Sequence, residues 1–265
     1  MSAIFTRKTL FLASLATLLA VCTLLWPGCQ GKTESPGQAA VDQSAPALSA
    51  GQAGKMLVCR KASEAPAVDG RIEELWQAAD TLRLDDPADV SDPNQVKIYT
   101  LWDNNYLYVS YEVADRYLVG FQTERDHKAL YKDDMIEVLL DPRREATDLW
   151  LEDDIVYHIN VLGQVKDDRG TPGGEVAKSD AGWQSAALFA VQYEGTLNDS
   201  TDQDRGYCVE LAVPWSEIGL SPAAGQKLGI DFASGDAEGA QEHLWDWCGA
   251  RPFRQPSVYG TLLLE

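Results

Sequence analysis

The sequence predicts an all-β protein: an antiparallel sandwich with Greek-key or jelly-roll-like connections and one or two short helices. Three observations lead to this prediction. Short segments that alternate between apolar and polar residues recur along the chain. Gly, Pro, Asp and Asn separate them, and these residue types suit tight turns. Long stretches with the apolar period of an amphipathic helix are lacking. Many short strands of this kind are typical of sandwiches.

The clearest strand pair spans residues 95–113. Within 106–113, Leu107 and every second residue after it are apolar, so we expect one buried and one solvent-facing side. Asp103-Asn104-Asn105 joins this strand to 95–102 and tolerates the left-handed backbone of a hairpin. Similar runs predict strands at 135–140, 155–162, 188–193, 207–213, 228–232 and 258–264. A helical turn or two is expected at 71–79, with Asp69 as its cap.

The amino terminus reads as an export signal. Arg7 and Lys8 precede an uncharged segment, 9–26, and a small residue, Gly28, stands before Cys29. The Gly28-Cys29 junction resembles a bacterial lipobox, so Cys29 is the expected lipid attachment site. The apolar run is also long enough to remain uncleaved as a membrane span. Either way we expect an exported protein held at a membrane, periplasmic or at the cell surface.

The remaining organisation follows from composition. Residues 30–55 are rich in Ala, Gly, Ser, Gln and Pro without a periodic apolar pattern, which predicts a flexible linker. The predicted organisation is therefore a signal peptide at 1–29, this linker, and one folded domain at 56–265. Lipidation of Cys29 would leave three cysteines in the domain, which allow one disulfide in any of three pairings: Cys59, Cys208 and Cys248.

The charge excludes one class of partner. Asp and Glu number 41 against 22 Lys and Arg, and the net charge is -19. Such a field repels nucleic acid and disfavours anionic membrane surfaces. It is compatible with neutral or cationic ligands and with divalent metals. The oligomeric state stays open.

A series of short motifs runs through residues 56–265 in a fixed order. They are Val68-Asp69-Gly70 with Trp76, Leu101-Trp102-Asp103, Tyr106-Leu107-Tyr108-Val109, Asp134 with Ile136-Glu137-Val138 and Asp141, Gly195-Thr196-Leu197-Asn198, Asp204-Arg205-Gly206-Tyr207, Val209-Glu210, Val213-Pro214-Trp215 and Tyr259-Gly260-Thr261-Leu262. Together they resemble the family 9-like carbohydrate-binding modules, which belong to the DOMON-like β-sandwiches. The resemblance implies a sandwich that binds a saccharide without catalysis.

The resemblance also implies a site. In that family two tryptophans stack on a sugar ring, while Glu, Arg and Asn side chains bind its hydroxyls, a chemistry that suits both surfaces of a sugar. Aligned on the motifs, the stacking positions fall on Tyr131 and Phe253, the glutamate on Glu137, the arginine on His158 and the asparagine near Ala250, with Arg251 and Arg254 close enough to replace lost donors. The three changes from Trp to Tyr, Trp to Phe and Arg to His should each weaken binding by about 1 kcal/mol or more.

Calcium is a further implication, because modules of the family hold it structurally. Asp199, Asp202 and Asp204 precede Gly206 and supply hard oxygen ligands at close spacing, although no bidentate Glu ends this run. The pairs Asp133-Asp134 and Asp153-Asp154 are additional candidates. Possible structural calcium is therefore the cofactor expected.

Other functions would require different residues. A glycosidase would need two carboxylates about 5 to 10 Å apart, for which Glu137 and Glu210 are conceivable. The chain lacks a nucleophile elbow, a zinc helix motif and a phosphate loop, so we predict no enzyme. Haem is disfavoured because, beyond the signal, methionine occurs only at Met56, at the domain edge, and Met135. A protein-interaction module with a decayed sugar site stays as the alternative to saccharide binding.

Overall fold

The computed structural model describes residues 54–84, 95–175, 178–180, 182–238, 241–249 and 254–265. Cys29, Ala250, Arg251 and Phe253 lie outside them. The strands are β1 (Met56–Lys61), β2 (Thr81–Arg83), β3 (Gln95–Trp102), β4 (Tyr106–Ala114), β5 (Met135–Asp141), β6 (Ile155–Asn160), β7 (Val165–Gly170), β8 (Ser179–Asp180), β9 (Leu188–Glu194), β10 (Gly206–Pro214), β11 (Lys227–Glu238), β12 (Gln241–Asp246) and β13 (Gly260–Leu264). Short 3₁₀ helices are η1 (Glu74–Ala78), η2 (Leu130–Lys132) and η3 (Pro256–Val258).

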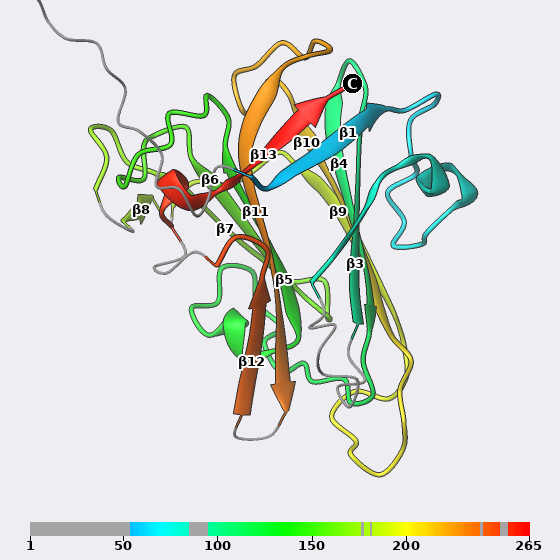
Figure 1. Cartoon of the computed structure of the whole chain (residues 1–265). Coiled ribbons are helices and arrows are strands. Elements are labelled where there is room, and N and C mark those ends of the chain that lie inside the picture. The colour runs from blue at the N-terminus through cyan, green and yellow to red at the C-terminus, as the bar shows by residue number, and fades with distance from the viewer. Residues whose placement is uncertain (1–53, 85–94, 176–177, 181, 239–240, 250–253) are drawn as a thin grey trace, which may run out of the picture. The chain divides into compact units, whose positions relative to one another are not determined.

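These strands form the two layers of a β-sandwich, which confirms the predicted fold class. The first layer has the order β8-β7-β6-β5-β11-β13, with β12 paired to β11, and the second has the order β3-β4-β10-β9, with β2 paired to β3. Figure 1 shows the two groups of strands. Strand β1 joins them, because its first part pairs with β13 and its end pairs with β3, both in parallel. The core fills the space between the layers.

The alternation in β4 correctly predicts which of its side chains face this core. It does not predict that side chains on the opposite face are buried too. Leu107 and Val109 are fully buried between the layers, as predicted. Tyr108 and Ser110, expected in solvent, are buried as well. Tyr108 packs in a second apolar cluster with Trp76 of η1. The chain between β1 and β2 therefore covers the outer face of β4.

One carboxylate holds that covering segment in place. Glu210 of β10 accepts hydrogen bonds from the backbone N–H groups of Asp69 and Gly70, each at 2.8 Å, through Oε2. Its Oε1 accepts the indole N–H of Trp76 at 2.9 Å. Asp69 does not cap the helix as expected. Its carboxylate accepts the N–H of Arg71, and η1 begins only at Glu74.

The three cysteines in the described ranges are free thiols, so no disulfide joins any pair of them. Cys59 lies in the core between the layers. Cys208 lies on β10 opposite Glu112, on the face away from that core, and Cys248 follows β12 and accepts the Gly260 N–H. Their side chains belong to different elements and different faces. Within the described ranges no helix is long and apolar enough to cross a membrane.

Candidate saccharide site

A cavity of about 410 Å³ opens on the outer face of β5, β6 and β11. Four of the predicted site residues line it: Tyr131, Glu137, His158 and Arg254. A second hollow, of about 420 Å³, lies against β4, β9 and β10. Among its four charged residues, which include Arg71 and Glu112, Glu194 and Arg205 pair with each other at 3.0 Å and are 71% and 84% exposed. Only the first cavity contains buried charged groups, so it is the better binding site.

Strand register creates the floor of this cavity. Glu137 of β5 lies opposite His158 of β6, which lies opposite Lys166 of β7. On the other side Glu137 faces Ala233 of β11. Residues directly opposite on antiparallel strands share a face, so these side chains form one row across the sheet. Gly235, two residues after Ala233 in β11, also lines the cavity.

Glu137 is the most distinctive group in the row. Its Oε1 accepts a hydrogen bond from His158 Nδ1 at 2.8 Å, and its side chain is only 6% exposed. Its Oε2 is buried and has no hydrogen-bond partner among the described residues. Burial opposes ionisation, yet the positive charges of His158, Arg254 and Lys166 outweigh it and hold the pKa of Glu137 below its ordinary value. Glu137 is thus an ionised acceptor with one oxygen that lacks a hydrogen-bond partner among the described residues.

Tyr131 supplies an aromatic surface. It lies in η2 and is 50% exposed, whereas its neighbour Leu130 is buried. The single turn of η2 therefore directs Leu130 into the protein and leaves the ring of Tyr131 at the cavity. A half-exposed aromatic ring of this kind can stack on an apolar face of a ligand.

Arg254 is held by residues that the sequence did not single out. Its Nη2 donates to Asp168 Oδ2, and its Nη1 donates to Ser179 Oγ at 2.7 Å. Its guanidinium carbon lies 4.8 Å from the ring centroid of Trp150. Lys166 Nζ also contacts Asp168 Oδ2. One feature of the sequence could have indicated these partners, namely the consecutive acids Asp167 and Asp168 in a short charged strand. Successive side chains of a strand point to opposite faces, so in a sandwich one of two consecutive acids faces the interior and needs a partner.

The run of acids expected to bind calcium, Asp199, Asp202 and Asp204, is not gathered at one point. Asp134 and Asp153, from the two additional candidate pairs, each lie in a cluster of acids. Asp199 accepts hydrogen bonds from Thr201, and both carboxylate oxygens of Asp204 accept backbone N–H groups. Asp202 is exposed. Two groups of acids in the described part of the chain do have oxygens within 4.8 Å of one another, and neither includes these three residues: Asp115, Asp134 and Asp236, and Asp141, Glu145 and Asp153.

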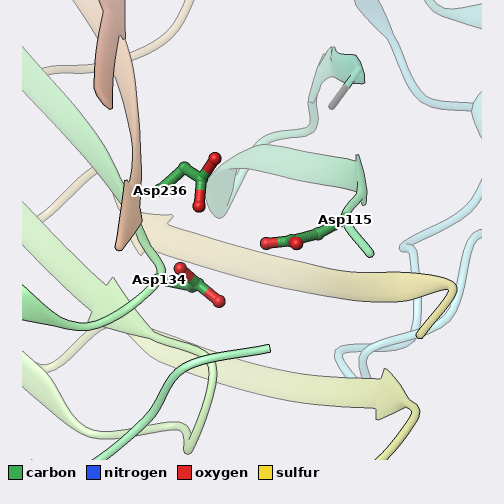
Figure 2. Close-up of side chains that lie close together, drawn as sticks. All are labelled: Asp115, Asp134 and Asp236. Carbon is green, nitrogen blue, oxygen red and sulfur yellow. The ribbon is translucent and has the colours of Figure 1, made fainter. Parts of the chain in front are cut away.

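The first of these groups, which we call the aspartate triad, is wholly buried. Asp115 follows β4, Asp134 precedes β5 and Asp236 lies in β11. Figure 2 shows the three side chains converging from these segments. Burial, together with the charge of Asp115, raises the pKa of Asp134 to about 9. Three carboxylates at this distance repel one another unless protons or a cation intervene, and their hard oxygens suit calcium.

A β-sandwich with a concave site on one sheet, formed by an aromatic ring, an ionised carboxylate and a braced guanidinium, defines a small-ligand-binding module. The chain belongs to a known family of such modules, because the model described as "Carbohydrate family 9 binding domain-like" matches residues 68–265. The resemblance drawn from the motifs is therefore confirmed.

Curated relatives match about three quarters of the chain. The chain is 28% identical over 203 residues to "Exoglucanase XynX" of Acetivibrio thermocellus, covering 75% of this chain and 16% of that protein. It is 27% identical over 204 residues to "Endo-1,4-beta-xylanase C" of Paenibacillus barcinonensis, with the same coverage. The chain thus spans about 16% of the length of these relatives, so the match concerns a small part of each.

Solved structures show the same fold. A family 9 carbohydrate-binding module from Caldicellulosiruptor kristjanssonii in complex with cellotriose has a TM-score of 0.58 at 20% identity, covering 80% of this chain and 94% of that one. A putative carbohydrate-binding protein from Bacteroides uniformis has a TM-score of 0.56 at 15% identity, covering 80% and 100%. Another structure of the Caldicellulosiruptor module is a complex with glucose.

Proposed function

We propose that this protein binds a saccharide non-covalently in the cavity over β5, β6 and β11. The observation that carries the proposal is Glu137, an ionised and buried carboxylate with one oxygen unused, in the same cavity as the exposed ring of Tyr131. Sugars present adjacent hydroxyls and an apolar C–H face, which these two groups match. Complexes of a family 9 module with cellotriose and with glucose support this ligand class.

Each residue then has a role. The ring of Tyr131 stacks on the sugar, and Glu137 Oε2 accepts a hydroxyl proton. His158 is oriented by its bond to Glu137 and turns its other nitrogen to the ligand, while Arg254 donates from the wall. Leu139 and Val156 supply apolar surface beside them.

We propose no catalysis at this site. Glu210, the imagined partner of Glu137 in a glycosidase, lies in the other layer and is used by Trp76 and the backbone at 69–70. A general acid also needs a raised pKa, whereas the pKa of Glu137 is lowered.

The proposed setting is outside the cytoplasm, with the module anchored through Cys29 or through an uncleaved signal segment and tethered by residues 30–55. The basic, apolar and small-residue order at the amino terminus supports this arrangement. A module tethered in this way would act by capture or adhesion, or beside an enzyme.

Calorimetric titration with glucose and cellotriose tests the proposal. We expect the protein to bind, and Tyr131→Ala to weaken the affinity about tenfold because the stacking surface is lost. Tyr193→Ala is the matched control, since Tyr193 is 43% exposed but lies on β9 in the other layer. A folded protein that binds no glycan, on an array as well as in solution, would favour the protein-interaction alternative.

We also propose that the aspartate triad holds a structural calcium ion, which would neutralise its charges and join the segments around β4, β5 and β11. Calcium should then raise the melting temperature and a chelator should lower it. Asp134→Asn should remove this calcium-dependent difference. Asp199→Asn should retain it, because Asp199 is only partly buried and lies outside the triad. The reverse pattern would return the site to the run from Asp199 to Asp204.

A further inference from the structure

We infer that Asp168 is a positioning residue of the saccharide site, which holds Arg254 toward the ligand and away from Glu137. The inference rests on the proposed function. Asp168 lies on β7 and only 1% of its side chain is exposed. Its Oδ2 contacts both Arg254 and Lys166, and its Oδ1 is buried without a hydrogen-bond partner among the described residues.

The geometry around Arg254 shows what Asp168 contributes. Asp168, Ser179 and the face of Trp150 contact the guanidinium from separate elements, so the long side chain is restricted before any ligand binds. Ordering such a side chain on binding would otherwise cost conformational entropy. These contacts use only some of the N–H donors of the planar guanidinium group. The side chain of Arg254 also lines the cavity.

The placement of Arg254 compensates for a difference between this sequence and the family pattern. His158 occupies the position at which the family pattern has arginine, and its Nδ1 is already bonded to Glu137. An imidazole then has one nitrogen left and cannot donate the parallel pair of bonds that arginine makes. Arg254 can supply that fork from a different segment of the chain.

Asp168 also protects the ligand-binding oxygen of Glu137. Arg254 and Lys166 are close enough to Glu137 for their charges to lower its pKa. Without a competing anion, the Arg254 guanidinium would be drawn to Glu137 Oε2 and would occupy the acceptor that a hydroxyl needs. Burial opposes ionisation of Asp168, yet Lys166 and Arg254 lower its pKa, so it stays charged and retains both cations.

The test uses the full chain with cellotriose as the probe, in a double-mutant cycle of Asp168→Asn and Arg254→Ala. We expect each single change to weaken binding about tenfold, and the double variant to bind no more weakly than Arg254→Ala alone. The ¹⁵N signal of Arg254 Nε–H should also exchange faster with solvent in Asp168→Asn. Asp167→Asn is the control, because Asp167 is equally buried but pairs with Arg125. The affinity of this variant for cellotriose should equal that of the wild type.

Two results would overturn the inference while leaving the proposed function intact: wild-type affinity in Asp168→Asn, or additive losses in the double variant. Either result counts only if the wild-type protein binds cellotriose and a Glu137 variant does not. Absence of binding by folded wild-type protein would overturn the proposed function and the role of Asp168 in it together. Thermal melting of every variant separates loss of the site from loss of the fold.

Discussion

Replacing Glu137 with Gln is expected to weaken saccharide binding at least about 100-fold, roughly 3 kcal/mol, while the protein stays folded. The carboxylate is the charged acceptor of the site, and charge-assisted hydrogen bonds are the strong ones. The amide keeps the size of the side chain but loses the charge and can direct an N–H group at the ligand. It also weakens the hold on His158, which donates to Glu137 at 2.8 Å.

Calorimetry with cellotriose measures this loss. The control is Glu112→Gln, because Glu112 lies in the other layer, is 41% exposed and pairs with Lys97. Since the pKa of Glu137 is lowered, the binding that depends on its charge should persist above pH 4.5 and disappear only as the pH falls further. Unchanged affinity in Glu137→Gln would mean that this cavity is not the saccharide site.

Replacing Glu210 is expected to have the largest effect on stability. Glu210→Gln should lower the free energy of unfolding by about 3 kcal/mol, because an amide cannot accept from all three donors: Trp76, Asp69 and Gly70. Glu210→Ala should cost more, since it leaves these donors without partners and adds a cavity. Trp76 would then lose the contact that holds its indole N–H.

Urea denaturation of the variants, followed by tryptophan fluorescence, measures this change. Glu112→Gln serves again as the control. It breaks a half-exposed ion pair on the neighbouring strand, so it should cost no more than about 1 kcal/mol. A Glu210→Gln protein as stable as the wild type would show that the segment at 62–79 is held by apolar packing alone.

The strands whose faces alternate could be predicted from the sequence, and those without alternation could not. Residues 95–102 form β3 within the predicted bounds, and β4 and β10 differ from the prediction only at their ends. The charged segment of β7 has no alternation of apolar and polar residues. Its acids are buried by ion pairs with Arg125 and Arg254 and not by apolar contacts. A propensity-based prediction has no means of finding such partners, which are distant in sequence.

The candidate site shows the same division. Motif order alone named Tyr131, Glu137, His158 and Arg254, and the fold brings them to one cavity. Motif spacing also named Asp199, Asp202 and Asp204 for calcium, but spacing says nothing about which hydrogen bonds an acid already makes. Backbone N–H groups bond to both oxygens of Asp204 and to both oxygens of Asp134. What distinguishes Asp134 is that Asp115 and Asp236 bring further carboxylates to it from two other segments.

The sequence by itself therefore determined the all-β class, most strands, the family and the residue types of the site, because these depend on local periodicity and motif order. Tertiary structure alone decided that the segment between β1 and β2 covers the outer face of β4 and that Glu210 holds this segment by hydrogen bonds. It also decided that Asp168 contacts Arg254. Each of these depends on a contact between groups far apart in the chain. Such contacts form only when strand register brings the groups together, and burial then makes their hydrogen bonds and charges strong enough to matter.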